Sequence, residues 1–530
     1  MSTEPTLTIG SLTIPATEQT PLVLALVEII RRQDAEIKAL KDEIHKLKGT
    51  TQRPKIEPSG LLKPPKPKPG PAGGKRPGSA KRMKTAKLII HKIIPLVIER
   101  LPEGTKLEGY RDFVVQDLKI AAYNTRYRRT VYRLPDGTLQ VAPRPANVAG
   151  HFGVTLKQFI LYQVHQLHAS QERLLEQLRE FGVDISAGQV SAILLDGHDA
   201  FHAEKDALLP TAREVCDVLH TDDTSARHCG QNAVCTHFGN DYFASFHTTD
   251  SKSRLNFLRL LCQPEERYTI SEEMLCSLEF LGAPGRLLDQ MAALPASEIF
   301  GRQAFGEQLD RWGIVSEGHR TLVCEAALYG TLLVECWYDK LGLISDDAPQ
   351  FKLGCFLHGL CWVHAERKVS RLIPLTTKHK RAWENVREQL WTFYEQLKAY
   401  RLAPTEAEKS RLAAEFDRIM EQRTGYPALN EALALLAAKR DGLLAVLDHP
   451  HLPLHNNLSE RDIREYARLR KVSGGTRSDL GRRCRDTFLS LKKTCRKLGV
   501  SFWQFLNDRL ANAGTIPPLP DLLREAAASQ

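Results

Sequence analysis

Apolar residues first recur with a seven-residue period near the N-terminus. Most other positions after Arg31 are polar or charged, which leaves one apolar seam. This pattern predicts a coiled coil within residues 1–50 that joins two subunits, although a helix packed against its own chain would have the same pattern. The two seam positions are Val23, Ile30, Ile37 and Ile44, and Leu26, Gln33, Leu40 and Leu47.

The next segment, residues 51–88, is dominated by Pro, Lys and Gly, as in LLKPPKPKPGPAGGKRPGSAKR. Such a composition cannot bury a core and stays extended. We therefore expect a basic linker here. Its cations, among them Lys81, Arg82 and Lys84, can lie along a DNA backbone, although a plain spacer has the same composition.

Residues 89–150 alternate in places and are rich in Val, Tyr and Thr, with a turn signal at Leu134-Pro135-Asp136-Gly137. They predict a small β-rich unit, which lacks cysteines and hence zinc ligands. Residues 151–206 predict helices, and FGVDISAGQVSAIL fits two helices around a tight turn with Ser186 as an N-cap. This is a helix-turn-helix that binds DNA or a plain helical hairpin.

Residues 207–470 mix strands with helices. The segment 215–221 predicts a strand that ends at Asp222, and a second apolar strand, LGLIS, ends at Asp346. Between them, AVCTHF and YFASFHTT flank Gly239-Asn240-Asp241, which is a strong hairpin signal. The distance between the two aspartates is long and indicates a helical insertion around 262–335.

The rest of this region continues the same mixture. LGCFLHGLCWVH predicts another strand, residues 375–445 predict helices, and a helix that carries Glu460 is expected to begin near Asn457. Strands mixed with helices predict an α/β domain. Residues 471–530 follow as a basic helical region, in which Phe502, Trp503 and Phe505 are expected in the core.

Composition excludes several classes of protein. Of 530 residues, 42% are hydrophobic, so the chain can build several cores. It contains neither an apolar run of about 18 residues nor the basic and apolar start of a signal peptide, so we expect no membrane contact and a cytoplasmic protein. The 11 cysteines are scattered without a Cys-x-x-Cys pair, which favours reduced thiols over a zinc site.

The net charge of +10 is concentrated in two segments. Residues 51–90 hold 11 Lys and Arg against one acid, and residues 461–500 hold 13 against four. Concentrated positive charge attracts a polyanion by displacing its condensed counterions. We therefore expect DNA as the partner, with Lys492, Lys493 and Arg496 beside it, although each segment alone would also suit a solvated surface.

Three acidic positions predict the chemistry. Asp222 and Asp346 follow strands, and Glu460 lies on a helix. Two divalent ions, Mg²⁺ or Mn²⁺, can activate a nucleophile and stabilise a leaving oxygen in phosphoryl transfer, and such hard ions take carboxylate ligands. The adjacent Asp223 and Asp347 compete for these positions.

Four motifs carry a resemblance to a known family. Asp222-Asp223-Thr224 matches a strand followed by Asp-Glu-Thr, and Asp346 has an aromatic residue, Phe351, five places later. A third motif is the CWVHAER segment at 361–367. The last comprises Asn456, Asn457, Glu460, Arg461 and Arg464. Across about 210–470 the chain resembles bacterial transposases of the insertion-sequence-66 family.

The resemblance implies a DDE transposase with an RNase H-like catalytic domain and helical insertions. It implies that Asp222, Asp346 and Glu460 are the metal ligands, with His364 and Asp347 as possible assisting residues. Arg461 and Arg464 would contact DNA phosphates, or else form surface salt bridges. The chain departs from the family in Asp346-Asp347-Ala348, in His455, and in lacking the cysteine-rich unit.

The expected function is metal-dependent 3′-end cleavage and strand transfer of an insertion sequence. Its partners would be the element ends and target DNA, a second copy of the chain or a larger assembly, and small accessory proteins of the element. Two alternatives are a non-catalytic DNA-binding protein, such as a decayed transposase, and an RNase H-like nuclease that cleaves without joining. The absence of a His-Glu-x-x-His motif argues against a zinc hydrolase.

Overall fold

The computed structural model describes residues 113–145, 150–295, 298–333, 341–352 and 357–529, with short stretches before them (7–9, 12–14, 20, 23, 89–96, 98, 102, 105–106 and 110). The chain divides into two units at Asp117. In the first, β1 (Leu7–Ile9) pairs antiparallel with β2 (Leu12–Ile14). Except for Val23, the predicted coiled-coil seam lies outside the described residues, as does the linker with Lys81, Arg82 and Lys84.

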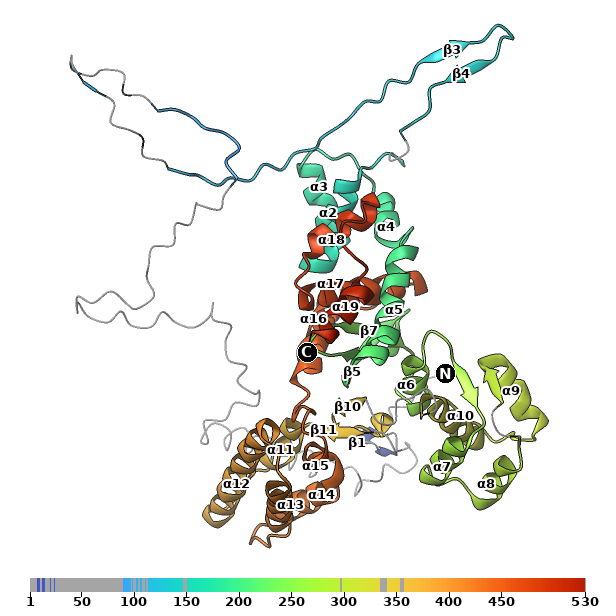
Figure 1. The fold of residues 1–530 in the computed structure, drawn as a ribbon, viewed down its shortest axis with the longest axis vertical. Helices are drawn as coiled ribbons and strands as arrows, with labels where there is room; N and C mark the ends of the chain where they lie inside the picture. The colour runs from blue at the N-terminus through green and yellow to red at the C-terminus, as the bar shows by residue number, and fades with distance from the viewer. Residues whose placement is uncertain are drawn as a thin grey trace. The chain divides into compact units, whose positions relative to one another are not determined.

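The second unit contains a five-stranded mixed sheet in the order β11-β10-β5-β6-β7 (Figure 1). The long central strand β5 runs antiparallel to β6, which runs antiparallel to β7, and β10 runs parallel to both β5 and β11. This sheet with its many helices confirms the α/β class. The strands are β5 (Val218–His228), β6 (Gln231–Gly239), β7 (Ala244–Thr249), β10 (Gly342–Ser345) and β11 (His358–Leu360).

The first hairpin extends β5 beyond the predicted end of the strand. β5 pairs with β6 as far as His228, where Cys229 and Gly230 turn the chain with φ of +48° and +78°. Positive φ at both central positions is typical of a type I′ hairpin turn. Asp222 therefore lies inside a strand rather than after one, and this corrects the expectation from the sequence.

The second hairpin is the predicted one. The Asn240 side chain accepts hydrogen bonds from the backbone N–H groups of Tyr242 and Phe243, which closes the turn between β6 and β7. The predicted LGLIS strand is also present as β10, and Asp346 directly follows it. Of the predicted strand around 354–364, the described part forms the short β11 and the start of helix α11.

Strand β7 is the last strand of the sheet, and helix α17 (Asp479–Lys497) covers its outer edge. Asp486, Ser490 and Thr494 accept hydrogen bonds from the backbone N–H groups of Thr248, Phe246 and Ala244, at 2.6, 2.9 and 3.2 Å. Four residues of helix advance about 6 Å and two residues of strand advance about 6.8 Å. Every fourth side chain of α17 can therefore reach every second N–H group of β7. A polar helix face thus satisfies a strand edge that would otherwise invite pairing with another chain.

Helices surround the sheet in groups. Ahead of it lie α2 (Val154–Leu167), α3 (Gln171–Glu180), α4 (Ala187–Leu195) and α5 (Asp199–Val215). Ser186 caps α4 as predicted, in a capping box with Gln189. α18 (Phe502–Ala511) packs on α2, and α19 (Leu519–Ala528) packs on α5. Phe502 and Phe505 are buried as expected, whereas Trp503 lies at the rim against Tyr162.

The predicted helical insertion between β7 and β10 is present and includes a small hairpin, β8 (Arg267–Thr269) with β9 (Ile299–Gly301). Its helices are α6 (Arg254–Leu261), α7 (Glu272–Phe280), α8 (Gly285–Ala292), α9 (Arg302–Arg311) and α10 (Glu317–Leu332). The 3₁₀ turn η3 (Pro349–Phe351) follows β10.

A second helical group follows β11 and has its own core around Trp362, Phe393 and Phe416. It comprises α11 (Trp362–Ser370), α12 (Thr377–Leu402), α13 (Glu406–Met420), α14 (Pro427–Ala437) and α15 (Arg440–Asp448), as predicted for 375–445. α16 (Asn457–Ser473) then returns the chain to β5 and β6. Among the described helices, none has the length and apolarity needed to cross a bilayer.

Ahead of these helices, β3 (Val131–Arg133) and β4 (Leu139–Val141) form an antiparallel hairpin. The predicted turn is closed by a hydrogen bond from the Gly137 N–H to the Leu134 carbonyl. All six strand residues are exposed. This hairpin is the described part of the predicted β-rich unit.

The contact between α17 and β7 predicts a stability effect. Ser490→Ala and Thr494→Val each leave a buried strand N–H without its partner, at a cost of about 1–3 kcal/mol. We expect both variants to unfold at a lower temperature than the wild type. The control is Thr377→Val on the exposed surface of α12, expected within about 0.5 kcal/mol of the wild type. Equal midpoints for all three variants would contradict this role of α17.

Candidate active site

Two aspartates meet where β5 and β10 run side by side. His220 and Ile344 are register partners in this parallel pair, and Asp222 and Asp346 each lie two residues further on. Burial, together with the negative charge of Asp346, raises the pKa of Asp222 to about 7. The fold therefore holds two carboxylates close enough to repel each other.

The neighbouring aspartates have different surroundings. Asp223 forms a 2.8 Å ion pair with Lys252 and accepts a hydrogen bond from Gln350. Asp347 pairs with three lysines, Lys352, Lys368 and Lys439. Among the described residues, no ion pair joins Asp222 or Asp346 to a cation. The two residues of each Asp-Asp pair therefore differ: the second forms ion pairs with lysine, and the first forms none with a described residue, although the charge of Lys368 acts on Asp346.

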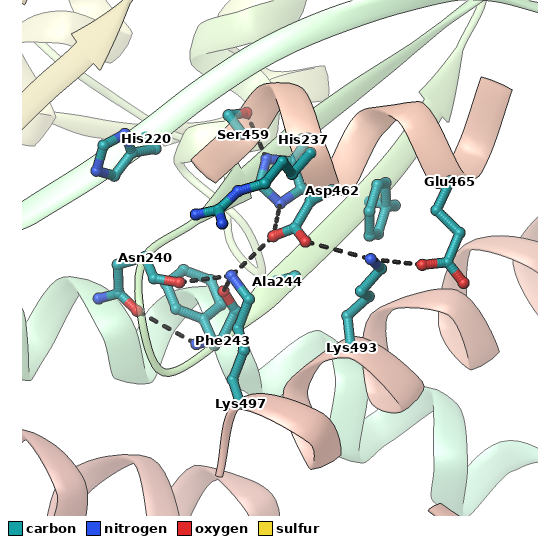
Figure 2. Close-up of polar contacts among 12 residues, drawn as sticks. His220, His237, Asn240, Phe243, Ala244, Ser459, Asp462, Glu465, Lys493 and Lys497 are labelled. Carbon is teal, nitrogen blue, oxygen red and sulfur yellow. Dashed lines mark hydrogen bonds and ion pairs between the residues drawn. The ribbon is translucent and has the colours of Figure 1, made fainter. Parts of the chain in front are cut away.

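Glu460 reaches this site from α16, in the predicted helix. On the same helix, Ser459 and Asp462 contact His237, which is the cross-strand partner of Asp222 on β6 (Figure 2). The negative charge of Glu460 also contributes to the raised pKa of Asp222. α16 therefore lies over the strand that carries Asp222 and brings Glu460, 9% exposed, towards it.

Asn456 connects three elements of the site and is completely buried. Its side-chain N–H donates to the Thr221 carbonyl at 2.7 Å, and its side-chain oxygen accepts from His220 at 3.0 Å. Its backbone N–H donates to the Cys361 sulfur at 3.2 Å. The residue before α16 is thereby tied to the strand of Asp222 and to the start of α11. The motif analysis singled out Asn456 but not this role, because its partners are far away in the chain.

Cations surround Glu460 in this structure. Arg464 lies 3.0 Å from its carboxylate, Arg367 lies 3.4 Å away, and His364 lies 3.7 Å away. Burial lowers the pKa of His364, although the charge of Glu460 opposes this. Arg464 therefore pairs with Glu460, rather than with Asp462 or Glu465, and Arg367 is a site residue that the sequence analysis had not identified.

A second possible ligand set lies beside the carboxylates. Ligand atoms of Cys361, His364 and Glu460 all lie within 4.8 Å of one another. Burial raises the pKa of Cys361 and favours the protonated thiol, although the hydrogen bond that its sulfur accepts from the Asn456 N–H opposes this. Because metals bind the thiolate, Cys361 is a poor ligand here.

Asp222, Asp346 and Glu460 are the alternative ligand set; among the described residues their oxygen atoms do not all lie within 4.8 Å of one another, so a shared cation would have to draw them together. They offer the oxygen ligands that Mg²⁺ and Mn²⁺ prefer. A cation bound by Asp222 and Asp346 would also remove the repulsion that raises the pKa of Asp222. Glu460 would join them by exchanging its contacts with arginine for the metal.

The lysines of α17 do not face solvent. Lys492 and Lys493 are 5% and 8% exposed and both pair with Glu465, while Lys497 pairs with Asp462 at 2.7 Å (Figure 2). The expectation that Lys492 and Lys493 flank DNA does not fit this burial, because acids of α16 take up their charge. Arg496 is exposed, as are Arg461 and Arg464.

Comparison with known proteins identifies the family of the chain, although the matched region contains neither Asp222 nor Asp346. The family model "Transposase IS66 family" matches residues 349–483, which include Glu460. The chain is 39% identical over 312 residues to the uncharacterized protein y4jO of Sinorhizobium fredii (strain NBRC 101917 / NGR234), covering 58% of this chain and 97% of that protein. An α/β protein with an acidic site is thereby placed among the transposases. The chain belongs to the IS66 transposase family, which confirms the resemblance seen in the motifs.

The raised pKa predicts a pH effect on stability. The pKa of Asp222 is about 7 in the folded protein against an ordinary 3.8. Without metal, the stability contributed by protonated Asp222 is complete below about pH 4 and is lost as the pH rises through about 7. Asp222→Asn removes this loss. We therefore expect it to match the wild-type melting temperature at pH 4 and to exceed it at pH 8, in chelator.

Asp223→Asn is the matched control, because it removes a carboxylate that Lys252 stabilises. At pH 8, the melting temperature of Asp223→Asn should not exceed that of the wild type. Added Mg²⁺ should then raise the melting temperature of the wild type more than that of Asp222→Asn, because only the wild type keeps both aspartates. A difference between Asp222→Asn and wild type that stays constant from pH 4 to 8 would refute the assignment.

Asn456 and its neighbour provide another matched pair. Asn456→Ala leaves the Thr221 carbonyl and His220 without partners in a buried site, at a cost of about 1–3 kcal/mol. We expect a lower melting temperature for this variant and little change for Asn457→Ala, since Asn457 is only partly buried. Thermal unfolding of the two variants decides the point. Equal losses would show that Asn456 has no special positioning role.

Proposed function

We propose that this protein is a DNA transposase that catalyses metal-dependent 3′-end cleavage and strand transfer of an insertion sequence. Asp222, Asp346 and Glu460 would hold two divalent ions, Mg²⁺ or Mn²⁺. The observation that carries the proposal is a pair of aspartates on adjacent parallel strands that form no ion pair with the described residues, together with a buried glutamate on α16 whose charge acts on Asp222. Membership of the IS66 transposase family supports it.

The sheet supports an RNase H-like catalytic domain. Its long central strand comes first in the chain, two antiparallel strands follow on one side, and two parallel strands lie on the other. The first acid is in the central strand, the second ends its parallel neighbour, and the third is on a later helix. Helices α6–α10 and α11–α15 would be insertions between these parts.

The reaction would have two steps at one site. Water attacks the phosphorus of a phosphodiester at the element end and breaks its P–O3′ bond, which leaves a 3′-hydroxyl on the element and a 5′-phosphate on the flanking DNA. This 3′-hydroxyl then attacks a target phosphodiester, joins the element to the target 5′-phosphate and releases a target 3′-hydroxyl. When bound, the divalent ions would stabilise the developing charge and lower the pKa of the attacking group. Asp222, Asp346 and Glu460 would hold them, while Arg367 and Arg464 provide positive charge for the phosphate next to Glu460.

The partners follow from this chemistry. DNA ends and target DNA are the substrates, and joining two ends calls for a dimer or larger assembly on DNA. Small accessory proteins of the same element are further partners. His364 lies close enough to Glu460 to help position it.

Adjacent aspartates make a sharp mutational test. We expect Asp222→Ala, Asp346→Ala and Glu460→Ala to lower cleavage and strand transfer about a hundredfold or more, since metal ions contribute several kcal/mol to the transition state. Asp223→Ala and Asp347→Ala should remain active, because ion pairs with lysine already occupy these carboxylates. The assay uses purified protein, the DNA ends of its own element and Mg²⁺ or Mn²⁺.

Three outcomes separate the alternatives. Cleavage without joining would identify a nuclease rather than a transposase. DNA binding without metal-dependent cleavage, even with accessory proteins present, would identify a non-catalytic DNA-binding protein. Full activity in Asp222→Ala and Glu460→Ala would exclude the proposed site.

A further inference from the structure

Helix α16 separates its charges by sign. Its three acids, Glu460, Asp462 and Glu465, turn inward, with side chains 11%, 9% and 18% exposed. Its outer positions carry cations instead. We call Arg461, Arg464, Arg468 and Lys471, all exposed, the α16 cationic face.

These four cations form one stripe. Their spacings of three, four and three residues keep them on the same side of a helix with 3.6 residues per turn. The stripe starts beside Glu460 and runs from Arg461 to Lys471, ten steps of about 1.5 Å each or about 15 Å. The opposite side of α16, with Ile463, Tyr466 and Leu469, is buried.

The stripe is not explained by the stability of the helix itself. Cations stabilise the last turn of a helix, which accounts for Lys471 but not for Arg461, Arg464 or Arg468, which precede that turn. Arg468 and Lys471 form no hydrogen bond or ion pair with any described residue. Arg468 and Lys471 therefore repel each other without an ion-pair partner among the described residues, and they form the part of the stripe that is farther from Glu460.

We propose that the α16 cationic face binds the DNA backbone next to the phosphate that is cut. This deepens the proposed function and depends on it for the position of the cut. About 15 Å corresponds to about four base-pair steps at 3.4 Å each, so the four cations match a short stretch of backbone. Phosphate contacts of this kind position DNA and do not read its sequence.

The basic α17 cannot supply this surface. Its lysines at 492, 493 and 497 are occupied by Asp462 and Glu465, the same acids that α16 turns inward (Figure 2). With the α17 lysines paired to the α16 acids, Arg468 and Lys471 form no ion pair with a described residue, whereas Arg464 pairs with Glu460. The charge available to a polyanion therefore lies on the outer side of α16.

Salt dependence of binding tests the proposal. Binding of labelled duplexes to the full chain is measured by fluorescence anisotropy in chelator, over a range of salt concentrations. Each phosphate contact contributes about 0.9 to the slope of log K against log salt. We expect Arg468→Gln and Lys471→Gln each to lower the slope by about 0.9, and the double variant by about 1.8, on element-end and unrelated duplexes alike.

The matched control is Arg381→Gln on α12, an exposed arginine outside the stripe, which should leave the slope unchanged. An unchanged slope in the double variant, or a loss confined to element-end DNA, would overturn the proposal. If the wild type cuts DNA and the slope is unchanged, the surface is wrong and the transposase function stands. If the slope falls and the wild type does not cut, the surface stands and the catalytic proposal fails.

Discussion

Like-charge repulsion between two aspartates is the constraint around which the catalytic region is built. The parallel pairing of β5 with β10 brings Asp222 and Asp346 to the same level of the sheet and partly buries them. Burial and the nearby charge both disfavour ionised Asp222, so its pKa rises to about 7. A carboxyl group whose pKa is raised by burial and a like charge is a candidate functional group, and a bound divalent cation, as proposed above, would offset this repulsion.

The position of Glu460 depends on a second group of charges, in which the acid Asp462 is paired with His237 and Lys497. Burial alone would raise the pKa of Asp462, but nearby His237 and Lys497 outweigh it and hold that pKa below its usual range. Such a buried set adds little net stability, yet removing one member leaves an unpaired charge. We infer that the network mainly fixes the rotation of α16, because turning the helix by one residue would bring Arg461 to the position of Glu460.

The sequence predicts local features well and long-range partners poorly. The strand before Asp346, the helix that carries Glu460, the Asn240 turn and the Ser186 cap follow from neighbouring residues, and all are present. The extension of β5 past Asp222 was missed because its turn uses Cys229, a residue without a turn preference. The partners of Asn456 lie about 235 positions away, so no local pattern could indicate them.

The basic C-terminal segment shows why net charge alone does not locate a DNA surface. Residues 461–500 hold 13 Lys and Arg, but Lys492, Lys493 and Lys497 neutralise acids inside the protein. Their positions on α17 follow from its packing on β7, which turns one side of that helix inward. The cations that remain for a polyanion are the exposed ones on the outer side of α16, of which Arg464 also contacts Glu460. Under the proposed function, one helix would thus hold a metal ligand on its inner side and DNA-binding cations on its outer side.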